Sequence, residues 1–149
     1  LDEDGEIRTR SREEIEAHYR NVPELHQNYA LKAVFRGTPC VQDEIREKMV
    51  ESKNHRRRSQ PLAASAGCIF KNPEGIGAGK LIDEMRMKGR NVGRAEVSHE
   101  HGNFIVNRGK ADAHDVLRLI DEIRAEAREQ RGIDLETEIQ VVGEDQPDF

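Results

Sequence analysis

The sequence has no long hydrophobic run and no excess of positive charge. None of its apolar runs approaches the roughly 18 residues that a helix needs to cross a bilayer, and no signal peptide opens the chain. These absences predict a cytoplasmic protein without a membrane partner. The net charge is -5 over 149 residues, so binding to phosphate backbones would need a local basic patch. We therefore expect no nucleic-acid partner.

Cysteine is scarce, because Cys40 and Cys68 are the only two in the sequence. They form no CxxC pair, so neither a disulfide scaffold nor a thiol-based zinc site is indicated, and we expect reduced thiols. His99 and His101 have a spacing that some metal sites use. No nearby third histidine or cysteine completes such a site, so we expect no metal and interpret the pair as a polar rim or a substrate contact.

The composition is polar, with 35% hydrophobic and 36% charged residues. At this length the chain can still bury the core of one modest domain. It begins at Leu1 without an initiator methionine, and we expect that an N-terminal part is missing.

The first sixty residues give three local signals. Ser11 and Glu14 make a capping box for a short helix that ends near Tyr19. Alternating apolar residues predict a strand over residues 28–36. Residues 38–58 then predict a connecting helix, which begins with Thr38 and Pro39 and repeats an apolar residue every four positions.

The second half alternates helices and strands. A glycine-rich entry at residues 75–79 leads into an amphipathic helix with Leu81, Ile82 and Met85 on one face. A short hairpin follows, with strands at Val97 and over residues 104–106.

The strongest helix signal begins at the cap Asp112 and ends at Gly132, with one continuous apolar stripe between them. A last strand is predicted from Glu138 to Val142. The acidic tail after Gly143 is predicted to be loose.

The most informative segment is SAGCIFKNP, residues 65–73. Small residues there predict a turn that presents Cys68, and Pro73 forbids a continuing helix or central strand. A lone cysteine is often a buried hydrophobe. A thiol with an ordinary pKa near about 8.5 is mostly protonated at neutral pH and can donate a proton, provided that Lys71 does not remove it. A carboxylic acid would complement it, and Glu138 is the candidate.

The glycines before Lys80 suggest a phosphate-binding loop, but the Walker A pattern fails. Glu74 occupies the position of the first glycine, and Leu81 replaces the metal-binding hydroxyl. Two interpretations stay open for this helix start: an anion site that uses the helix dipole and Lys80, or a plain flexible turn.

Five sequence blocks occur in one order: SAGCIFKNP, AGKLI, KG, VSHEHGNFIVN and GIDLETEIQVVGE. Together they resemble the C-terminal, substrate-binding part of the UDP-N-acetylenolpyruvoylglucosamine reductases, the MurB family. The resemblance covers about residues 60–144. It implies an α+β fold in which residues 59–149 form the substrate-binding domain and residues 38–58 a connecting helix. Residues 1–37 would be the tail of an FAD-binding α+β domain.

This resemblance also implies a function. The family reduces the enolpyruvyl group of UDP-N-acetylglucosamine enolpyruvate in peptidoglycan precursor synthesis, with NADPH as the reductant and FAD as the hydride carrier. Cys68 stands where most members have a serine that donates a proton, and Glu138 matches the family's catalytic glutamate. The matching substrate-binding positions are Tyr19, Arg20, Lys71, Asn72 and His101.

Some positions depart from the family pattern. Val22 replaces a serine after the tyrosine-arginine pair, residues 85–89 read MRMKG in place of AGLKG, and Thr137 replaces a proline. The glycine-rich flavin-binding segments are absent. FAD-binding residues therefore cannot be assigned, and we expect that this piece needs the missing FAD domain and does not hold FAD alone.

Two other functions stay open. The chain could be a non-catalytic UDP-sugar-binding module, in which Cys68 and Glu138 would be replaceable. A basic run from Lys53 to Arg58 could contact RNA or a phosphate, although such runs are commonly solvated helix ends, where cations are favoured. No stacking aromatics interleave it.

Overall fold

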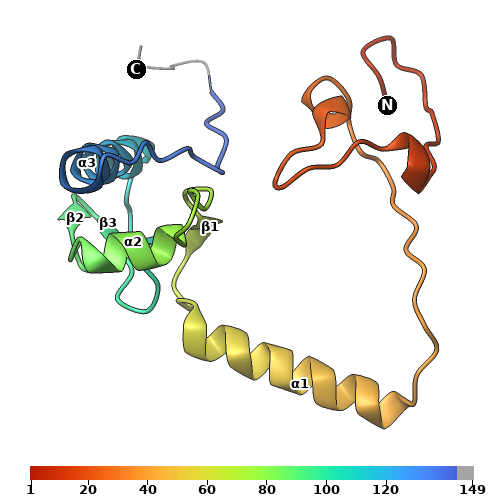
Figure 1. Cartoon of the computed structure of the whole chain (residues 1–149), viewed down its shortest axis with the longest axis horizontal. Helices are drawn as coiled ribbons and strands as arrows, with labels where there is room; N and C mark the ends of the chain where they lie inside the picture. The colour runs from red at the N-terminus through yellow and green to blue at the C-terminus, as the bar shows by residue number, and fades with distance from the viewer. Residues whose placement is uncertain (144–149) are drawn as a thin grey trace. The chain divides into compact units, whose positions relative to one another are not determined.

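The computed structural model describes residues 1–143 of the chain. These residues divide into two compact units, one of residues 1–42 and one that begins at Asp43 (Figure 1). No helix within residues 1–143 is both long and apolar enough to cross a membrane. The tail after Gly143, which was predicted to be loose, lies outside the described residues.

The first unit contains two short 3-10 helices, η1 (Arg12–Glu14) and η2 (Pro23–His26). The capping box at Ser11 is confirmed, since its backbone N–H donates to the Glu14 carboxylate over 2.8 Å. The predicted helix to Tyr19 is wrong, because η1 stops after one turn. An isolated helix of this length is marginal without an apolar face to pack, and none of residues 1–42 is buried.

The strand predicted for residues 28–36 is also wrong. The segment has no strand assignment, and side chains on both of its faces are exposed, Val34 by 88% and Phe35 by 90%. An alternating pattern becomes a strand only when a neighbour accepts its ladder of hydrogen bonds. Within residues 1–143 no strand pairs with this segment.

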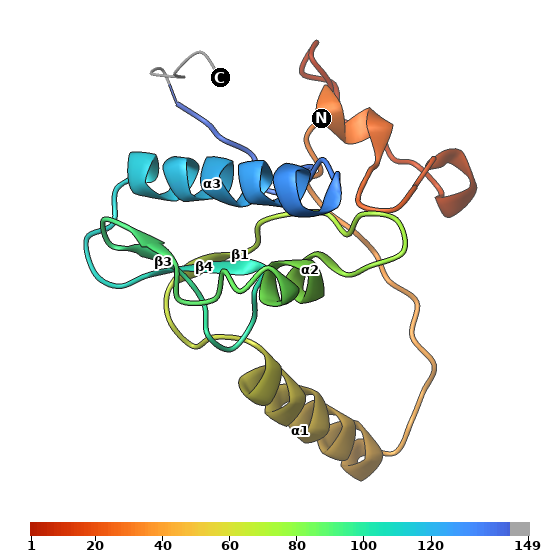
Figure 2. The same cartoon turned by 60° about the vertical axis from the view of Figure 1, so that its left-hand side comes forward.

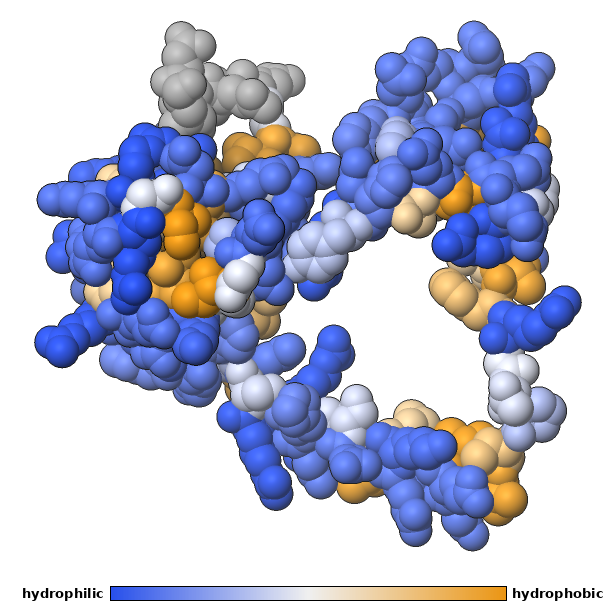
Figure 3. Space-filling view, viewed as in Figure 1, coloured by the Kyte–Doolittle hydropathy of each residue, from blue (hydrophilic) through white to orange (hydrophobic). Residues whose placement is uncertain are grey.

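The connecting helix α1 (Gln42–Ser59) confirms the predicted helix, although it begins four residues after Thr38. Asp43 and Glu44 lie in its first turn, where carboxylates stabilise a helix N-terminus. No residue of α1 is buried. Its apolar positions, which include Ile45 and Met49, stay exposed and gather near its N-terminal end (Figure 3).

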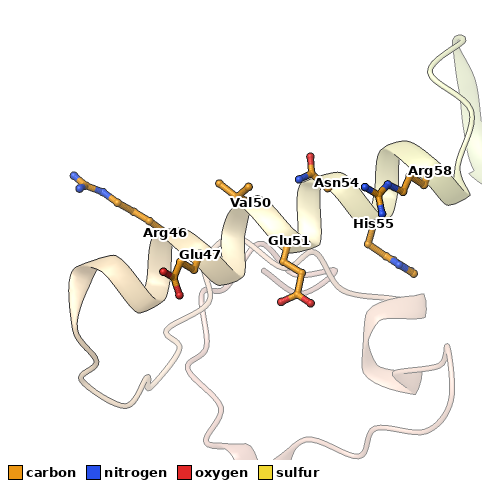
Figure 4. Close-up of a pocket in the computed structure, with 7 residues that line it drawn as sticks. All are labelled: Arg46, Glu47, Val50, Glu51, Asn54, His55 and Arg58. Carbon is orange, nitrogen blue, oxygen red and sulfur yellow. The ribbon is translucent and has the colours of Figure 1, made fainter.

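One hollow lies along α1, lined by seven residues between Arg46 and Arg58 (Figure 4). All seven come from the same helix, so the hollow has no second wall. The basic run predicted as a possible RNA contact ends this helix, with Arg56, Arg57 and Arg58 exposed in its last turn. That is the position at which cations suit the helix dipole.

The described residues of the second unit form a four-stranded antiparallel sheet with the order β1-β4-β3-β2. The strands are β1 (Ser65–Cys68), β2 (Asn91–Val92), β3 (Ala95–Val97) and β4 (Phe104–Asn107). Two helices complete the fold, α2 (Ala78–Glu84) and α3 (Ala113–Arg131). Helix α3 lies across one face of the sheet (Figure 2) and also contacts α2. This arrangement confirms the predicted α+β class.

The core lies between the sheet and these two helices. Leu81 and Ile82 of α2 and its C-cap residue Met85 are buried, which confirms the predicted apolar face. Val97 of β3 pairs with Ile105 of β4, and both side chains belong to the same core cluster. The cluster comprises Ile69, Phe70, Ala78, Leu81, Ile82, Met85, Met87, Ala95, Val97, Ile105, Leu119, Ile120, Ile123, Ala127 and Leu135.

Helix α3 begins and ends as predicted. The Asp112 carboxylate accepts a hydrogen bond from the backbone N–H of Asp115 over 2.9 Å. Gly132 ends the helix in the left-handed conformation with a φ of 66°, which favours glycine. Ile120, Ile123 and Ala127 of the predicted apolar stripe are buried, whereas Ala113 at its start is exposed. Leu119, which was not part of the predicted stripe, is also buried.

The last strand, predicted from Glu138 to Val142, is wrong as a regular strand. A single bridge pairs Thr137 with Phe70, and beyond it Val142 is 86% exposed. Further pairing would run along the partner segment toward Gly67. A bulge there bends the partner strand, and a bend of this kind ends a regular ladder.

We predict that Asp112→Ala destabilises the second unit by about 1 kcal/mol, because α3 loses its N-terminal cap. Urea unfolding of the chain measures this change. Asp121→Ala, an exposed position within the same helix, is the control and should change stability by less than about 0.5 kcal/mol. Equal losses in the two variants would contradict the capping role.

Candidate active site

Strand β1 carries a β-bulge directly before Cys68. Ser65 pairs with Val106 and Cys68 with Phe104, so β1 has one more residue than β4 between the two pairs. Gly67 lies in the bulge with a φ of 87°, which a side chain at this position would strain. The predicted turn is therefore a bulged strand, and bulges commonly re-aim a side chain next to a functional site. Cys68 ends the strand and is half-buried.

After Cys68 the chain is held on one side by Asn103. The backbone N–H of Ile69 donates to the Asn103 carbonyl over 2.9 Å. The Phe70 N–H donates to Asn103 Oδ1 over 2.9 Å, and Asn103 Nδ2 donates to the Phe70 carbonyl over 2.8 Å. Three hydrogen bonds therefore join this segment to the residue that precedes β4.

On its other side the same segment pairs with residues 136–138. The Lys71 N–H donates to the Glu136 carbonyl over 2.8 Å, and the Glu138 N–H donates to the Ile69 carbonyl over 2.8 Å. The backbone of Glu138 is thus bonded to the immediate neighbour of Cys68. Cys68 and Glu138, predicted to act together, lie on paired segments although they are far apart in the sequence.

Lys71 forms an ion pair with the carboxylate of Glu136, and its own side chain is 27% exposed. Proton donation by the Cys68 thiol requires that the charge of Lys71 should not remove its proton. The Glu136 carboxylate offsets part of that charge. Sequence reasoning missed Glu136. It lies in the same block as Glu138, two residues away, but exposed carboxylates give no signal of their partners.

Asn72 stabilises the start of α2. Its Oδ1 accepts the backbone N–H of Ala78, the first residue of the helix, over 3.0 Å. Lys80 lies 3.8 Å from the Glu84 carboxylate one turn further along. The glycine-rich helix start is therefore a turn that is capped by a side chain from outside the helix, and an anion site there stays a prediction.

His101 packs closely against the beginning of α2. A Cβ atom on Gly79 would lie 2.6 Å from Cε1 of the imidazole, so only glycine fits beneath the ring. The ring also contacts Phe104 edge-on at 4.9 Å between centroids. Its Nδ1 accepts the Asn103 N–H over 3.1 Å, which places the proton on Nε2. Burial, followed by the nearby charge of Lys88, lowers the pKa of His101.

His99 does not join His101. Its ring covers Gly89, and its Nε2 lies 3.6 Å from the Glu96 carboxylate, which also accepts a hydrogen bond from Arg108 over 2.6 Å. Within residues 1–143 no three histidine, cysteine or acidic side chains are placed to hold a metal ion.

Tyr19 and Arg20 belong to the other unit, so their relation to Cys68 stays a prediction. The Arg20 guanidinium lies 5.9 Å from the centroid of the Tyr19 ring, within the range of a cation–π contact. Arg20 has a φ of 55°, and Tyr19 is 60% exposed. Both side chains are exposed.

The described residues do not fit FAD by themselves. None of residues 1–42 is buried, so this unit has no interior that could enclose the flavin ring.

Two buried polar residues of the β3–β4 connection were not predicted. Ser98 is fully buried, and its hydroxyl donates to the Glu100 carboxylate and accepts the N–H of His101. Asn103 is 3% exposed. In the sequence both residues lie in the polar stretch SHEHGN between Val97 and Phe104, which does not show which of its members are buried.

Nearly the whole chain, 97% of it, is similar to known proteins. The family model described as UDP-N-acetylenolpyruvoylglucosamine reductase, C-terminal domain, matches residues 60–142. Among curated proteins, the chain is similar to the reductases of that name from Agathobacter rectalis (45% identity over 97% of the chain) and Clostridium novyi (40% over 97%). It covers 46% and 48% of them, so it spans about half the length of these relatives.

A shorter relative and a solved structure agree. The UDP-N-acetylenolpyruvoylglucosamine reductase of Bacillus licheniformis is 41% identical, and the chain covers 80% of it. The crystal structure of the Thermus caldophilus enzyme, MurB, superposes with a TM-score of 0.56 at 48% identity, over 66% of this chain and 34% of that one. The chain therefore belongs to the UDP-N-acetylenolpyruvoylglucosamine reductase (MurB) family, and residues 60–142 are its C-terminal domain.

Proposed function

We propose that the chain is the substrate-binding part of a UDP-N-acetylmuramate dehydrogenase. The complete enzyme would reduce UDP-N-acetylglucosamine enolpyruvate to UDP-N-acetylmuramate in the cytoplasm, for peptidoglycan precursor synthesis. NADPH would supply the electrons through FAD, which a part of the enzyme outside the described residues would hold. The family membership and the names of the relatives support this assignment.

One observation supports the proposal most directly. The Glu138 N–H donates to the carbonyl of Ile69, the residue next to Cys68, over 2.8 Å. The proposed proton donor and its proposed carboxyl partner therefore lie on adjacent, hydrogen-bonded segments.

The reaction assigns a task to each of the two residues. Addition of hydride to one carbon of the enolpyruvyl double bond leaves negative charge on the carboxyl-conjugated neighbouring carbon, which must then accept a proton. The Cys68 thiol donates that proton and becomes a thiolate, which regains a proton from solvent before the next turnover. The Glu138 carboxyl stabilises the enolate-like intermediate through a hydrogen bond.

Three further residues of this domain bind the substrate: Asn72, His101 and Lys71. Asn72 uses its Oδ1 on the N–H of Ala78, so its amide N–H groups are the ones offered to a substrate oxygen. His101 offers Nε2–H in its neutral form, because Nδ1 already accepts a hydrogen bond. Lys71 supplies positive charge for the diphosphate, shared with Glu136.

Replacement of the proposed proton donor tests the function. In the complete reductase we expect Cys68→Ala to lower substrate turnover by about 10²- to 10⁴-fold, the usual contribution of a general acid. Reduction of the flavin by NADPH should not change. Cys68→Ser should keep substantial activity, since a hydroxyl can take the same position. Stopped-flow kinetics measures the two half-reactions separately.

The matched control is Cys40→Ala, which removes the other, exposed thiol and should leave both half-reactions unchanged. Parental turnover in Cys68→Ala would rule out the proposed proton donor. A parent protein that binds the UDP-sugar tightly but never reduces it would favour the non-catalytic binding module.

The packing of His101 on α2 gives a second test. Helix propensity alone predicts that Gly79→Ala stabilises the protein by about 1 kcal/mol, but the new Cβ would displace the imidazole. We expect a several-fold rise in KM for the UDP-sugar with a smaller change in kcat. In Gly77→Ala the Cβ would lie 3.8 Å from Asn72 Oδ1, so this control should keep the parental KM. Equal KM values in both variants would argue against the contact.

The lowered pKa of His101 predicts how stability depends on pH. As pH falls below the ordinary histidine value of about 6.5, the unfolded chain takes up the proton first, so stability is lost as pH falls through the lower folded pKa. We expect the urea midpoint of the chain to fall more between about pH 7.5 and about pH 5 than that of His101→Gln. Parallel decreases would show that His101 does not contribute.

A further inference from the structure

Asn103 is a buried side chain with a full set of backbone partners. It is 3% exposed and, with Ser98, one of the two buried polar residues found within residues 1–143. Its carboxamide accepts the N–H of Phe70 and donates to the carbonyl of the same residue. The side chain thus pairs with Phe70 as the backbone of a neighbouring strand would.

The backbone of Asn103 reaches two further parts of the site. Its carbonyl accepts the N–H of Ile69 over 2.9 Å, and its N–H donates to Nδ1 of His101 over 3.1 Å. One residue therefore bonds to the segment that follows Cys68 and also sets the tautomer of His101. No proposed catalytic or substrate-binding role required this residue.

The geometry of the sheet explains why an amide is needed here. The regular β1–β4 pairing ends where Cys68 meets Phe104. Phe70 faces Thr137 on its other side, but the bonds of that bridge run through Lys71 and Glu138 and leave the N–H and carbonyl of Phe70 unused. Phe70 is 1% exposed, so water does not replace these bonds, and buried backbone groups need partners.

We propose that Asn103 is a positioning residue of the active site, a role that rests on the proposed function. The Asn103 carboxamide bonds to both the N–H and the carbonyl of Phe70 and so fixes the position of this residue. Cys68 lies two residues before Phe70 in the chain, and Asn72 lies two residues after it. The Asn103 N–H keeps the His101 proton on Nε2. Asn103 itself touches no reacting atom.

The first test uses Asn103→Leu in the complete reductase. Leucine has a similar size but forms neither hydrogen bond to Phe70. We expect kcat for substrate reduction to fall by about 10- to 100-fold, as for other residues that orient active-site groups, while reduction of the flavin by NADPH stays unchanged.

Asn103→Asp supplies a readout that a purely structural role would not give. A carboxylate can accept the N–H of Phe70 but cannot donate to its carbonyl, whereas a protonated carboxyl can do both. We expect kcat of Asn103→Asp, relative to the parent at the same pH, to rise as pH falls. The ratio for Asn103→Leu should stay flat. If Asn103→Leu does not fold, this pH profile decides the question, and a flat profile overturns the proposal.

The matched control is Asn107→Leu at the other end of β4. Asn107 Oδ1 also accepts backbone N–H groups, from Gly109 over 2.8 Å and Ala111 over 3.1 Å, but these bonds hold the turn after β4 and not the segment from Ile69 to Lys71. Its loss should lower the melting temperature without lowering kcat. If Asn103→Leu loses no more kcat than Asn107→Leu, the positioning role is overturned.

A separate readout distinguishes failure of this proposal from failure of the proposed function. If the parent enzyme does not reduce the UDP-sugar, the proposed function is wrong. The positioning role of Asn103 is then tested by the rate at which the Cys68 thiol is alkylated in the full chain. Iodoacetamide would be used in a Cys40→Ser background. A several-fold change in the alkylation rate in Asn103→Leu but not in Asn107→Leu supports positioning of the thiol, and equal rates overturn it.

Discussion

The site depends on the backbone pairing of three residues, Ile69 to Lys71, with two different partners. On one side Asn103 bonds to them, and on the other side residues 136–138 do so. The proposed catalytic and substrate-binding residues of the second unit belong to this segment, flank it or lie on one of its partners, except His101, whose Nδ1 accepts the N–H of Asn103. Because both neighbours are bonded through short, well-directed contacts, the segment has little freedom to move relative to either.

This constraint explains why irregular structure surrounds Cys68. A regular strand would continue its ladder with β4 and would give the site no distinct shape. The bulge at Gly67 interrupts that ladder, which ends at the pair of Cys68 and Phe104. Beyond this pair, the backbone groups of Ile69 to Lys71 bond to Asn103 and to residues 136–138. The chain thus leaves the regular ladder after Cys68 while its next backbone groups keep hydrogen-bond partners. Bulges commonly re-aim a side chain next to a functional site.

The domain is held by a small core under a highly charged surface. The apolar faces of α2 and α3 cover the sheet, whereas most ion pairs are exposed and add little stability. The packing is nevertheless specific close to the site. The His101 ring leaves no room for a side chain at Gly79, so the start of α2 and the β3–β4 connection must stay in register for the imidazole to keep its place.

Local signals in the sequence were sufficient for elements whose stability is local. Asp112 and Gly132 bound α3 as predicted, because a cap and a left-handed glycine act within one turn of the chain. The same reasoning failed for residues 28–36 and for residues 138–142. An alternating pattern is a necessary feature of a strand, but a strand also needs a partner, and partners are set by tertiary contacts.

The sequence by itself determined the family and the α+β class, since these depend on ordered motifs and on hydrophobic periodicity, and it proposed the residues of the site. It also singled out Cys68 and Glu138 as a pair, without a means to show that they meet. Tertiary structure alone decided that their segments are neighbours and that Asn103 joins the site. The physical reason is that a buried backbone group takes whichever donor or acceptor the fold brings to it, and that partner leaves no mark in the local sequence.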